Sequence, residues 1–492
     1  MKLREILKDV KYTTKDESLL DKEIKDIKID HRLVEDGDLY IALQGRNFDG
    51  NLFSEEAVRN GASIIVNDRN FFFREGINVK NAREAYAKMC KNFFGRACES
   101  LKIVAVTGTN GKTTTCNTIA DVLKMAGKRV GVIGTLGAKY DGKVEETGFT
   151  TPDPYLLHDI FAKMKKARVE YVIMETSAHA LELNKLDGIT FEVGVLTNIT
   201  EDHLDYFGEM DNYAKAKFKL FENGRVKLGL VCAGKRYVHE LLQSAQVPML
   251  TYGFNVRSDF KGEVIEKTFN GSMFSCQSRS GNMGIMTPLV GQYNLENALA
   301  SVAVCKCLGI DDWDIKKGMS CTLPVEGRFN VIRGNNCNII IDYAHTPDGL
   351  EKVLKTAKEL TKGKLVAVFG CGGNRDKFKR PVMGKIASEI ADEVILTSDN
   401  PRFENPYVII DEIKKGITKK NFRIEEDRKK AINYALSTFN QGETIVIAGK
   451  GAEKYQEIKG RKYPYNDFDV VCEYYKKAAS KEDFFNDEME ND

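Results

Sequence analysis

Short apolar runs alternate with amphipathic stretches along most of the chain and predict an α/β protein. In the middle of the sequence, Lys102–Gly108 has the pattern of a buried strand, a glycine-rich loop follows, and an apolar-periodic helix runs to Met125. The next strand is predicted within residues 129–134, which completes a βαβ unit. Further strands of the buried type are predicted at Tyr171–Met174, Val193–Leu196 and Leu228–Cys232. The pattern therefore predicts an open parallel sheet.

A second series of strands and helices begins near Gly327 and predicts another doubly wound domain. The stretch from Leu350 to Leu360 carries its apolar residues on one helical face. The remaining elements are strands at Asn338–Ile341, Leu365–Phe369, Glu393–Thr397 and Thr444–Ala448, and helices around Val382–Ile390 and Arg428–Phe439. We therefore predict a Rossmann-like domain at the C-terminal end.

The first hundred residues are less regular and predict a small mixed α/β domain. Leu39–Leu43 and Ser63–Val66 are typical of short strands, and Glu84–Phe94 of a helix. The fold class is therefore α/β with three domains, the central one built on a parallel sheet. The predicted domains are residues 1–97, 98–326 and 327–492. A chain of 492 residues agrees with three domains at about 150 residues each.

Composition narrows the classes of function. Lys and Arg (73) exceed Asp and Glu (71) by only two, so no strong positive field exists to hold nucleic acid or a membrane surface. No apolar run approaches the roughly 18 residues of a transmembrane helix, and the N-terminus lacks the pattern of a signal peptide. The 11 cysteines contain no C-x-x-C pair, which argues against a disulfide framework and a zinc site. We expect a cytoplasmic monomer whose partners are small molecules.

A glycine-rich loop between the first central strand and its helix predicts a phosphate-binding site. In such a loop the glycines let backbone amides approach the phosphates, and the helix N-terminus adds positive potential. Lys112 is placed to reach the terminal phosphates and Thr113 to bind magnesium. The loop is a compact variant, because Val106 stands where the usual pattern has its first glycine. Its residues are Gly108, Thr109, Asn110, Gly111, Lys112, Thr113 and Thr114.

Two neighbouring strand ends carry further candidate ligands for magnesium. Glu175 directly follows the strand Tyr171–Met174, and His203 follows the strand that ends near Asn198. Magnesium prefers oxygen ligands at the carboxyl ends of such strands, so Glu175 is the best acidic candidate. A single histidine is more often structural, and the residues alone leave the role of His203 open.

Motifs along most of the chain, from about residue 26 to 470, together resemble the Mur ligases. They are VTGTNGKTTT (106–115), TTPD (150–153), METSAHAL (174–181), TNITEDHLDYFG (197–208), YAKAKFKLF (213–221), GQYNLENALA (291–300), GRF (327–329), DYAHTPDGL (342–350), FGCGGNRDKFKRPVMG (369–384), DNPR (399–402) and GKGAEKYQ (449–456). Within the family they are most similar to the UDP-N-acetylmuramoyl-tripeptide synthetases, which add the third peptide residue of the peptidoglycan precursor.

The resemblance implies a fold and a reaction. The N-terminal domain of this protein would bind the UDP end of the sugar substrate. The central domain would be a P-loop-type parallel-sheet ATPase domain, and the C-terminal Rossmann-like domain would bind the incoming amino acid. ATP, with Mg²⁺, would phosphorylate a carboxylate of UDP-MurNAc-L-Ala-D-Glu. The amino group of the incoming amino acid would then attack the acyl phosphate, and phosphate would leave. Lysine and magnesium suit this chemistry because they neutralise charge during phosphoryl transfer.

The same resemblance assigns residue roles. Glu175 and His203 would join Thr113 in the metal shell, and Lys217 aligns with a family lysine that is carbamylated. A carbamate supplies anionic oxygens, whereas an ammonium group would repel magnesium. The expected catalytic residues are thus Lys112, Glu175, His203 and Lys217. Further ATP contacts are expected from Asn297, Arg328 and Asp342, and contacts to the muramoyl-dipeptide from Thr150, Thr151 and Ser177.

The chain departs from the family pattern at the nucleotide-sugar end. His31 stands where a serine near the uridine is common, and Arg46 follows Gly45 where a histidine is common. Leu183 and Lys185 replace glutamine and arginine, so the planar two-pronged geometry of arginine is lost at the second position. We expect His31 and Lys185 to contact this substrate, although the departures leave the exact uridine contacts open.

The incoming amino acid is predicted from Asp399-Asn400-Pro401-Arg402. The family form with this arginine goes with meso-diaminopimelate, whose second carboxylate a guanidinium can bind through two hydrogen bonds. Arg375, Gly449 and Glu453 match the other family contacts, and Glu453 suits the distal ammonium group. Ala452 stands where histidine is frequent in diaminopimelate users, and L-lysine remains the alternative substrate.

Three other classes of protein share some of these features. A folylpolyglutamate synthetase has the same loop and modified lysine, but the N-terminal domain and Asp399–Arg402 argue against it. A P-loop switch or motor NTPase would leave the amino-acid motifs without a role. A silent binding homologue would not be expected to retain Lys112, Glu175, His203 and Lys217 together.

Overall fold

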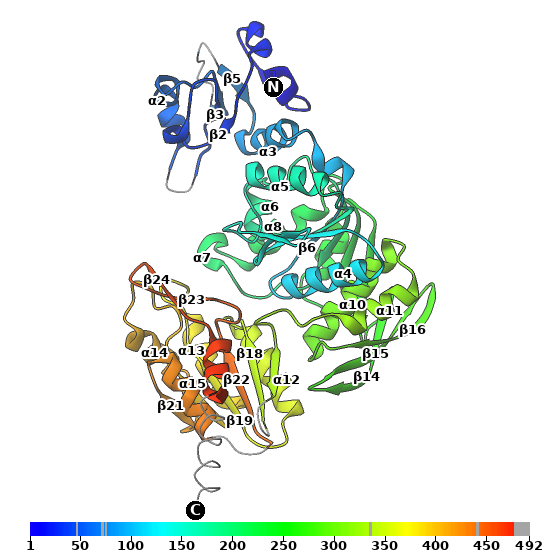
Figure 1. Ribbon diagram of the computed structural model, residues 1–492, viewed down its shortest axis with the longest axis vertical. Coiled ribbons are helices and arrows are strands. Elements are labelled where there is room, and N and C mark those ends of the chain that lie inside the picture. Colours follow the sequence, from blue (N-terminus) through cyan, green and yellow to red (C-terminus); the bar gives the residue numbers. More distant parts are fainter. Residues whose placement is uncertain (46–47, 70–72, 74–75, 334–336, 439–441, 477–492) are drawn as a thin grey trace, which may run out of the picture.

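The computed structural model describes residues 1–45, 48–69, 73, 76–333, 337–438 and 442–476. Three α/β bodies follow one another along the longest axis (Figure 1). This arrangement confirms the predicted three-domain α/β fold class, while the exact boundaries at residues 97 and 326 stay a prediction. None of the helices among the described residues has the length and apolar character needed to cross a membrane.

The N-terminal body is built on a five-stranded sheet of order β1-β5-β4-β3-β2, in which only β1 is antiparallel to its neighbour. Its strands are β1 (Tyr12–Thr13), β2 (Ile27–Lys28), β3 (Leu39–Ile41), β4 (Ile64–Asn67) and β5 (Gly76–Val79), and its helices are α1 (Leu3–Ile6), α2 (Ser54–Arg59) and α3 (Ala82–Phe93). Asn81 caps α3 by accepting hydrogen bonds from the backbone amides of Arg83 and Glu84.

The central body contains an eleven-stranded sheet of order β16-β15-β14-β13-β12-β11-β6-β10-β7-β8-β9. Its strands are β6 (Lys102–Thr107), β7 (Val130–Gly134), β8 (Gly137–Tyr140), β9 (Lys143–Glu145), β10 (Tyr171–Glu175), β11 (Phe191–Leu196), β12 (Val226–Cys232), β13 (Met249–Phe254), β14 (Phe260–Thr268), β15 (Gly271–Ser278) and β16 (Gly281–Thr287). Its helices are α4 (Lys112–Met125), α5 (Pro154–Lys166), α6 (Ala178–Glu182), α7 (Leu204–Phe207), α8 (Met210–Phe218), α9 (Val238–Ser244), α10 (Gln292–Cys307) and α11 (Asp312–Cys321).

Helices cover both faces of the central sheet, as the continuous apolar strands require. Successive residues of β6 alternate between the two cores: Ile103 and Ala105 pack on the side of α5, and Val104 and Val106 on the side of α4 and α10 (Figure 1). The sheet is parallel from β7 to β14, as the sequence pattern predicts for its centre. It differs from an all-parallel sheet at both edges, where β8, β9, β15 and β16 are antiparallel.

The C-terminal body has a six-stranded sheet of order β17-β18-β22-β19-β20-β21, parallel except for β17 at the edge. Its strands, with a separate β23–β24 hairpin, are β17 (Asn330–Arg333), β18 (Asn338–Asp342), β19 (Leu365–Phe369), β20 (Glu393–Leu396), β21 (Phe422–Ile424), β22 (Thr444–Ala448), β23 (Tyr455–Ile458) and β24 (Arg461–Pro464). Its helices are α12 (Pro347–Leu360), α13 (Lys379–Ile390), α14 (Pro406–Lys414) and α15 (Arg428–Ser437). The predicted end of the last helix, Phe439, lies outside the described residues.

A buried ion pair fastens the C-terminal helical segment, residues 467–476, to α15. Arg428 donates from Nε and Nη2 to the two carboxylate oxygens of Asp467, each at 2.8 Å, and both side chains are 0% exposed.

We expect Asp467→Ala to lower the free energy of unfolding by about 3–5 kcal/mol, because it leaves a buried guanidinium without its counter-charge. Chemical denaturation measures this. Lys429→Ala is the control, since Lys429 pairs with Glu473 on the surface, and its effect should stay below about 1 kcal/mol. Equal effects would contradict the prediction.

Candidate active site

The phosphate loop lies at the carboxyl end of β6, between the ends of β10 and β11. Gly108 has φ +146°, and a Cβ there would collide with the hydroxyl of Thr197. Gly111 has φ +87°, and a Cβ there would collide with the amide of Asn297. Only glycine satisfies both the conformation and the close approach at these positions. The loop is held further by Asn198, whose Oδ1 accepts a hydrogen bond from the Asn110 amide at 3.0 Å.

Glu175 lies at the end of β10, in register with Val106 of β6, and reaches the phosphate loop. Thr113 Oγ1 donates to its Oε1 at 2.9 Å, and the amide of Thr135 donates to the same oxygen at 3.1 Å. Thr135 and Thr150 share a hydroxyl contact of 3.1 Å. The structure therefore brings Thr113, Glu175 and Thr150 together, although they are far apart in the sequence.

The backbone after β10 places Thr151 and Ser177 beside Glu175. Thr151 Oγ1 donates to the Glu175 carbonyl at 2.9 Å and accepts from the Ser177 amide at 3.0 Å. The Ser177 hydroxyl caps α6 by accepting from the Ala180 amide at 3.2 Å. Both hydroxyls thus have structural partners, and Thr150 is the member of this group that lines the open cleft.

Two lysines belong to this site. Lys112 Nζ donates to the carbonyls of Gly108 and Thr109 at 2.9 and 3.0 Å, and burial lowers its pKa while Glu175 opposes the shift. Lys217 is 1% exposed, and its Nζ lies 4.4 Å from the ring centroid of Tyr213. Burial, reinforced by the charge of Lys112, lowers the pKa of Lys217 well below its ordinary value.

His203 lies at the start of α7 in a left-handed conformation, with φ +56°. Its Nε2 is 3.4 Å from a carboxylate oxygen of Asp202, and its ring packs edge-on against His179 with centroids 4.9 Å apart. Burial lowers the pKa of His203, while Asp202 opposes the shift. His203 is therefore mainly neutral at neutral pH, the form in which a histidine can bind a metal.

The side chains beside the phosphate loop suit some metal ions better than others. Within the described ranges, no set of three His, Cys, Asp or Glu side chains converges as a metal site. The site therefore does not suit zinc, which needs three or four protein side chains as ligands. Thr113 and Glu175 instead offer oxygen atoms beside a phosphate loop. Magnesium is commonly bound by one or two carboxylates together with substrate phosphates, so these residues fit it.

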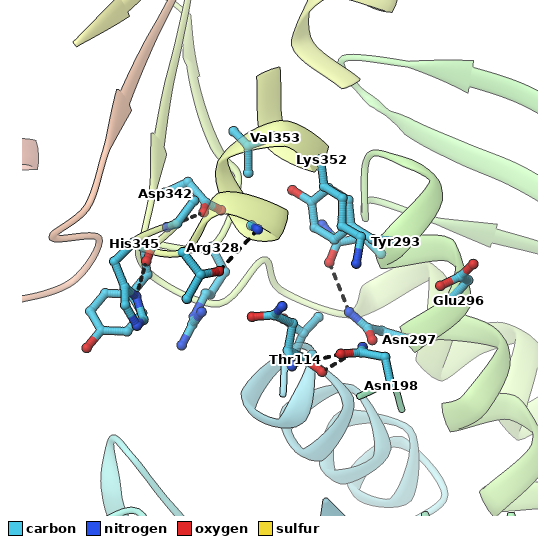
Figure 2. Close-up of a pocket in the computed structure, with 17 residues that line it drawn as sticks. Thr114, Asn198, Tyr293, Glu296, Asn297, Arg328, Asp342, His345, Lys352 and Val353 are labelled. Carbon is cyan, nitrogen blue, oxygen red and sulfur yellow. Dashed lines mark hydrogen bonds between the residues drawn. The ribbon is translucent and has the colours of Figure 1, made fainter. Parts of the chain in front are cut away.

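A pocket between the central and C-terminal bodies continues from the phosphate loop (Figure 2). Figure 2 shows Thr114 and Asn297 on the central side and Arg328 and Asp342 on the C-terminal side. Asp342 accepts hydrogen bonds from the amides of Phe329 and Ala344, both at 2.7 Å. Burial raises the pKa of Asp342 to about 6, with Arg328 opposing the shift. The predicted ATP contacts from both bodies therefore share one pocket.

The predicted amino-acid residues follow the carboxyl ends of β19, β20 and β22 in the C-terminal sheet. Gly449 has φ +116°, and a Cβ there would meet the Asp399 carboxylate at 2.5 Å. Arg402 Nε donates to Glu457 at 3.1 Å and its Nη1 donates to the Gly373 carbonyl at 2.9 Å. Pro401 lies next to it in the same loop. These contacts fix the guanidinium at the wall of a cleft.

That cleft connects the amino-acid residues to the phosphate site. Its walls include His203 of the central body and Arg375, Asn400, Arg402 and Glu453 of the C-terminal body. The adjoining cleft is lined by Thr113, Thr150, His203, Arg328, Arg375 and Glu453. The structure therefore brings together predicted residues from the ATP, metal, dipeptide and amino-acid groups.

Two residues that hold the side chains of this cleft in place were not among the candidates identified from the sequence. Lys450 is completely buried and donates to Glu453 Oε2 at 2.8 Å, so Glu453 already has a basic partner. Glu457 holds Arg402, as described above. The lysine inside the motif GKGAE could have drawn attention, because it follows a mostly apolar strand, but its burial cannot be derived from spacing.

The nucleotide-sugar candidates lie apart from this junction. Lys185 lines a pocket between the N-terminal and central bodies with Phe48, Arg83 and Leu183, and its Nζ is 2.6 Å from an Asp153 oxygen. His31 is 6% exposed and stacks on Phe53 with centroids 4.3 Å apart. The structure thus places Lys185 at a cleft and His31 inside an aromatic stack. Arg46 lies outside the described residues.

Comparison with known proteins gives matches along nearly the whole chain. Residues 23–94 match the model of the Mur ligase family catalytic domain, residues 106–305 the Mur ligase middle domain, and residues 327–451 the Mur ligase glutamate ligase domain. A UDP-N-acetylmuramoyl-L-alanyl-D-glutamate–2,6-diaminopimelate ligase of Clostridium tetani is 38% identical over 482 residues, which cover 96% of this chain and 99% of the relative. The ligase of the same name from Aquifex aeolicus is 39% identical over 467 residues, or 93% and 95% of the two chains.

Solved structures share the same architecture. A structure of a UDP-N-acetylmuramoyl-L-alanyl-D-glutamate–2,6-diaminopimelate ligase has a TM-score of 0.72 and 30% identity, covering 97% of this chain and 99% of the other. A Mycobacterium tuberculosis folylpolyglutamate synthase complexed with ADP and AMPPCP has a TM-score of 0.63 over 74% of this chain and 92% of the other, at 19% identity. The second likeness concerns the fold alone.

Proposed function

Because this chain belongs to the Mur ligase family, we propose that it catalyses the ATP-dependent addition of meso-diaminopimelate to UDP-MurNAc-L-Ala-D-Glu. The observation that carries the proposal is a pair of adjoining clefts that share His203 and Glu453 in their walls, one lined also by Thr113 and the other by Arg402. An enzyme that forms an amide bond from an acyl phosphate needs its phosphate site and its amino-acid site in one such space.

Different groups of residues would bind the ATP phosphates, the nucleoside and the dipeptide. The amides of the phosphate loop and Lys112 would bind the ATP phosphates and hold the terminal one toward the cleft. Arg328 would add a positive charge from the C-terminal side, and Asn297 and Asp342 would line the nucleoside end. Thr150, Thr151 and Ser177 would orient the dipeptide so that its carboxylate meets the terminal phosphate. Placement and neutralised charge are the main needs of phosphoryl transfer.

Mg²⁺ belongs to the proposal, with Thr113, Glu175, His203 and a carbamate on Lys217 as its protein ligands. The oxygen atoms that Thr113 and Glu175 place next to each other support a magnesium site here. When bound, magnesium would neutralise charge on the phosphates during transfer. Closure of the junction between the two bodies would keep water away from the acyl phosphate.

The choice of amino acid follows from charge. Arg402, held by Glu457 and the Gly373 carbonyl, offers a guanidinium to a distal carboxylate, and Glu453 offers a carboxylate to a distal ammonium. Meso-diaminopimelate carries both groups, whereas L-lysine carries only the ammonium. Arg375, at the mouth of the same cleft, would meet another carboxylate of the substrates.

Phosphate release from ATP tests the proposal. The assay contains UDP-MurNAc-L-Ala-D-Glu with meso-diaminopimelate, with L-lysine, or with no amino acid, and a further arm contains folate and glutamate. We expect rapid release only with diaminopimelate. Phosphate release that did not depend on the muramoyl substrate would overturn the ligase proposal, and faster release with lysine would overturn only the amino-acid specificity. Activity in the folate arm would favour the alternative ligase.

A further inference from the structure

Lys450 is a buried cation directly after the last strand of the C-terminal sheet. Its side chain is 0% exposed, and every residue of β22, the strand before it, is buried as well. Removing a charged group from water is costly unless it is paired and hydrogen-bonded. An apolar side chain at this position would avoid that cost, so the presence of lysine requires a specific partner.

The ammonium group has its partners in the amino-acid site. Lys450 Nζ donates to Asn400 Oδ1 at 3.0 Å and to Glu453 Oε2 at 2.8 Å. Asn400 Nδ2 donates to the same Glu453 oxygen at 2.8 Å, which closes a triangle of three side chains. The rings of Tyr455 and Tyr465 lie 5.7 and 5.9 Å from Nζ and form the aromatic wall behind it.

The triangle determines the orientation of the Asn400 amide. Its Oδ1 accepts from Lys450 and also from the backbone amide of Glu457 at 2.9 Å, while its Nδ2 faces a carboxylate. Reversing the amide would set an NH₂ group against two donors, so only one orientation satisfies all partners. A single network therefore links Lys450, Asn400 and the segment that holds Arg402.

Glu453 is held by one of its two oxygens. Both donors of the network point at Oε2, which leaves Oε1 as the oxygen available to the cleft that Glu453 lines. A carboxylate held in a fixed orientation presents one acceptor oxygen in a defined direction. That is what recognition of a substrate ammonium group requires.

We propose that Lys450 is a positioning residue for substrate selection: through Asn400 and Glu453 Oε2 it aims Glu453 Oε1 at the distal ammonium group of the incoming amino acid. The inference rests on the proposed function and adds to it a residue that acts behind the substrate contacts. Glu457 joins the network through its backbone amide and binds Arg402 through its side chain. The network therefore also fixes the position of the Arg402 guanidinium, the donor for the distal carboxylate, relative to Glu453, the acceptor for the ammonium group.

A double-mutant cycle on the full-length chain tests this role. Lys450→Met, Glu453→Gln and the double variant are compared with the wild type by steady-state kinetics. Lys450→Met should raise the KM for meso-diaminopimelate about 10-fold, the scale of a lost charge-assisted hydrogen bond, and leave the KM for ATP within about twofold. Because Lys450 acts through Glu453, the double variant should be no worse than Glu453→Gln alone. Lys415→Met, an exposed lysine after α14, is the matched control and should match the wild type.

The possible outcomes separate this inference from the proposed function. An unchanged KM for diaminopimelate in Lys450→Met, or effects that multiply in the double variant, would overturn the positioning role. Absence of diaminopimelate-dependent phosphate release in the wild type would overturn the proposed function instead. If Lys450→Met does not fold, the same cycle with Lys450→Gln decides the question, since its amide can still donate to one of the two acceptors.

Discussion

Lys217→Ala is expected to reduce turnover about 100-fold or more, the scale on which loss of one electrostatic group in a preorganised site acts. Lys217 is 1% exposed, and no anionic side chain among the described residues forms an ion pair with it. Burial and the charge of Lys112 lower the pKa of Lys217 well below its ordinary value, which favours the uncharged amine, the form that reacts with carbon dioxide. A carbamate would turn this group from a cation into an anion beside the phosphate site.

Chemical rescue distinguishes this role from a structural one. Acetate added to Lys217→Ala should restore part of the turnover, because a small carboxylate can occupy the space of the carbamate, whereas chloride at equal ionic strength should not. Lys215→Ala, two residues away on the exposed side of α8, should behave like the wild type. Full activity of Lys217→Ala would remove Lys217 from the mechanism, and loss without rescue would indicate that its packing against Tyr213 is what matters.

The sequence predicted the centre of each large sheet because those strands are buried on both faces. Continuous apolar runs such as β6, β19 and β22 are typical of parallel strands under two layers of helices. The phosphate loop could also be located, because its glycines and lysine stand between a strand and a helix. Glu175 was predicted beside it since parallel strands end at the same edge.

The edges of the sheets could not be predicted in the same way. Strands β14, β15 and β16 are half exposed, and their residues alternate between polar and apolar without a long apolar run. The Lys450 network was also beyond reach, because it joins residues 50 and 53 positions apart through contacts set by tertiary packing. Spacing along the chain carries no information about which lysine is buried.

Arg402→Ala is expected to raise the KM for meso-diaminopimelate by about 10- to 100-fold while leaving ATP binding intact. Two of its nitrogens, Nε and Nη1, are engaged by Glu457 and the Gly373 carbonyl, so the guanidinium of this cleft-lining residue is fixed before substrate arrives. Its removal withdraws the partner of the substrate's distal carboxylate. It also leaves Glu457 uncompensated, and this negative charge would repel the same carboxylate.

Two further variants separate these contributions to the KM for diaminopimelate. Arg402→Ala combined with Glu457→Gln removes the repelling charge, so its KM should lie between those of the wild type and Arg402→Ala. Arg402→Lys keeps the positive charge but loses the planar fork, and should therefore show an intermediate KM as well. Arg423→Ala is the control, because Arg423 is an exposed arginine of the same domain that stacks on Tyr434. An unchanged KM for diaminopimelate in Arg402→Ala would refute the specificity assignment, whereas an equal rise in the KM for ATP would show that the substitution disturbs the whole domain junction.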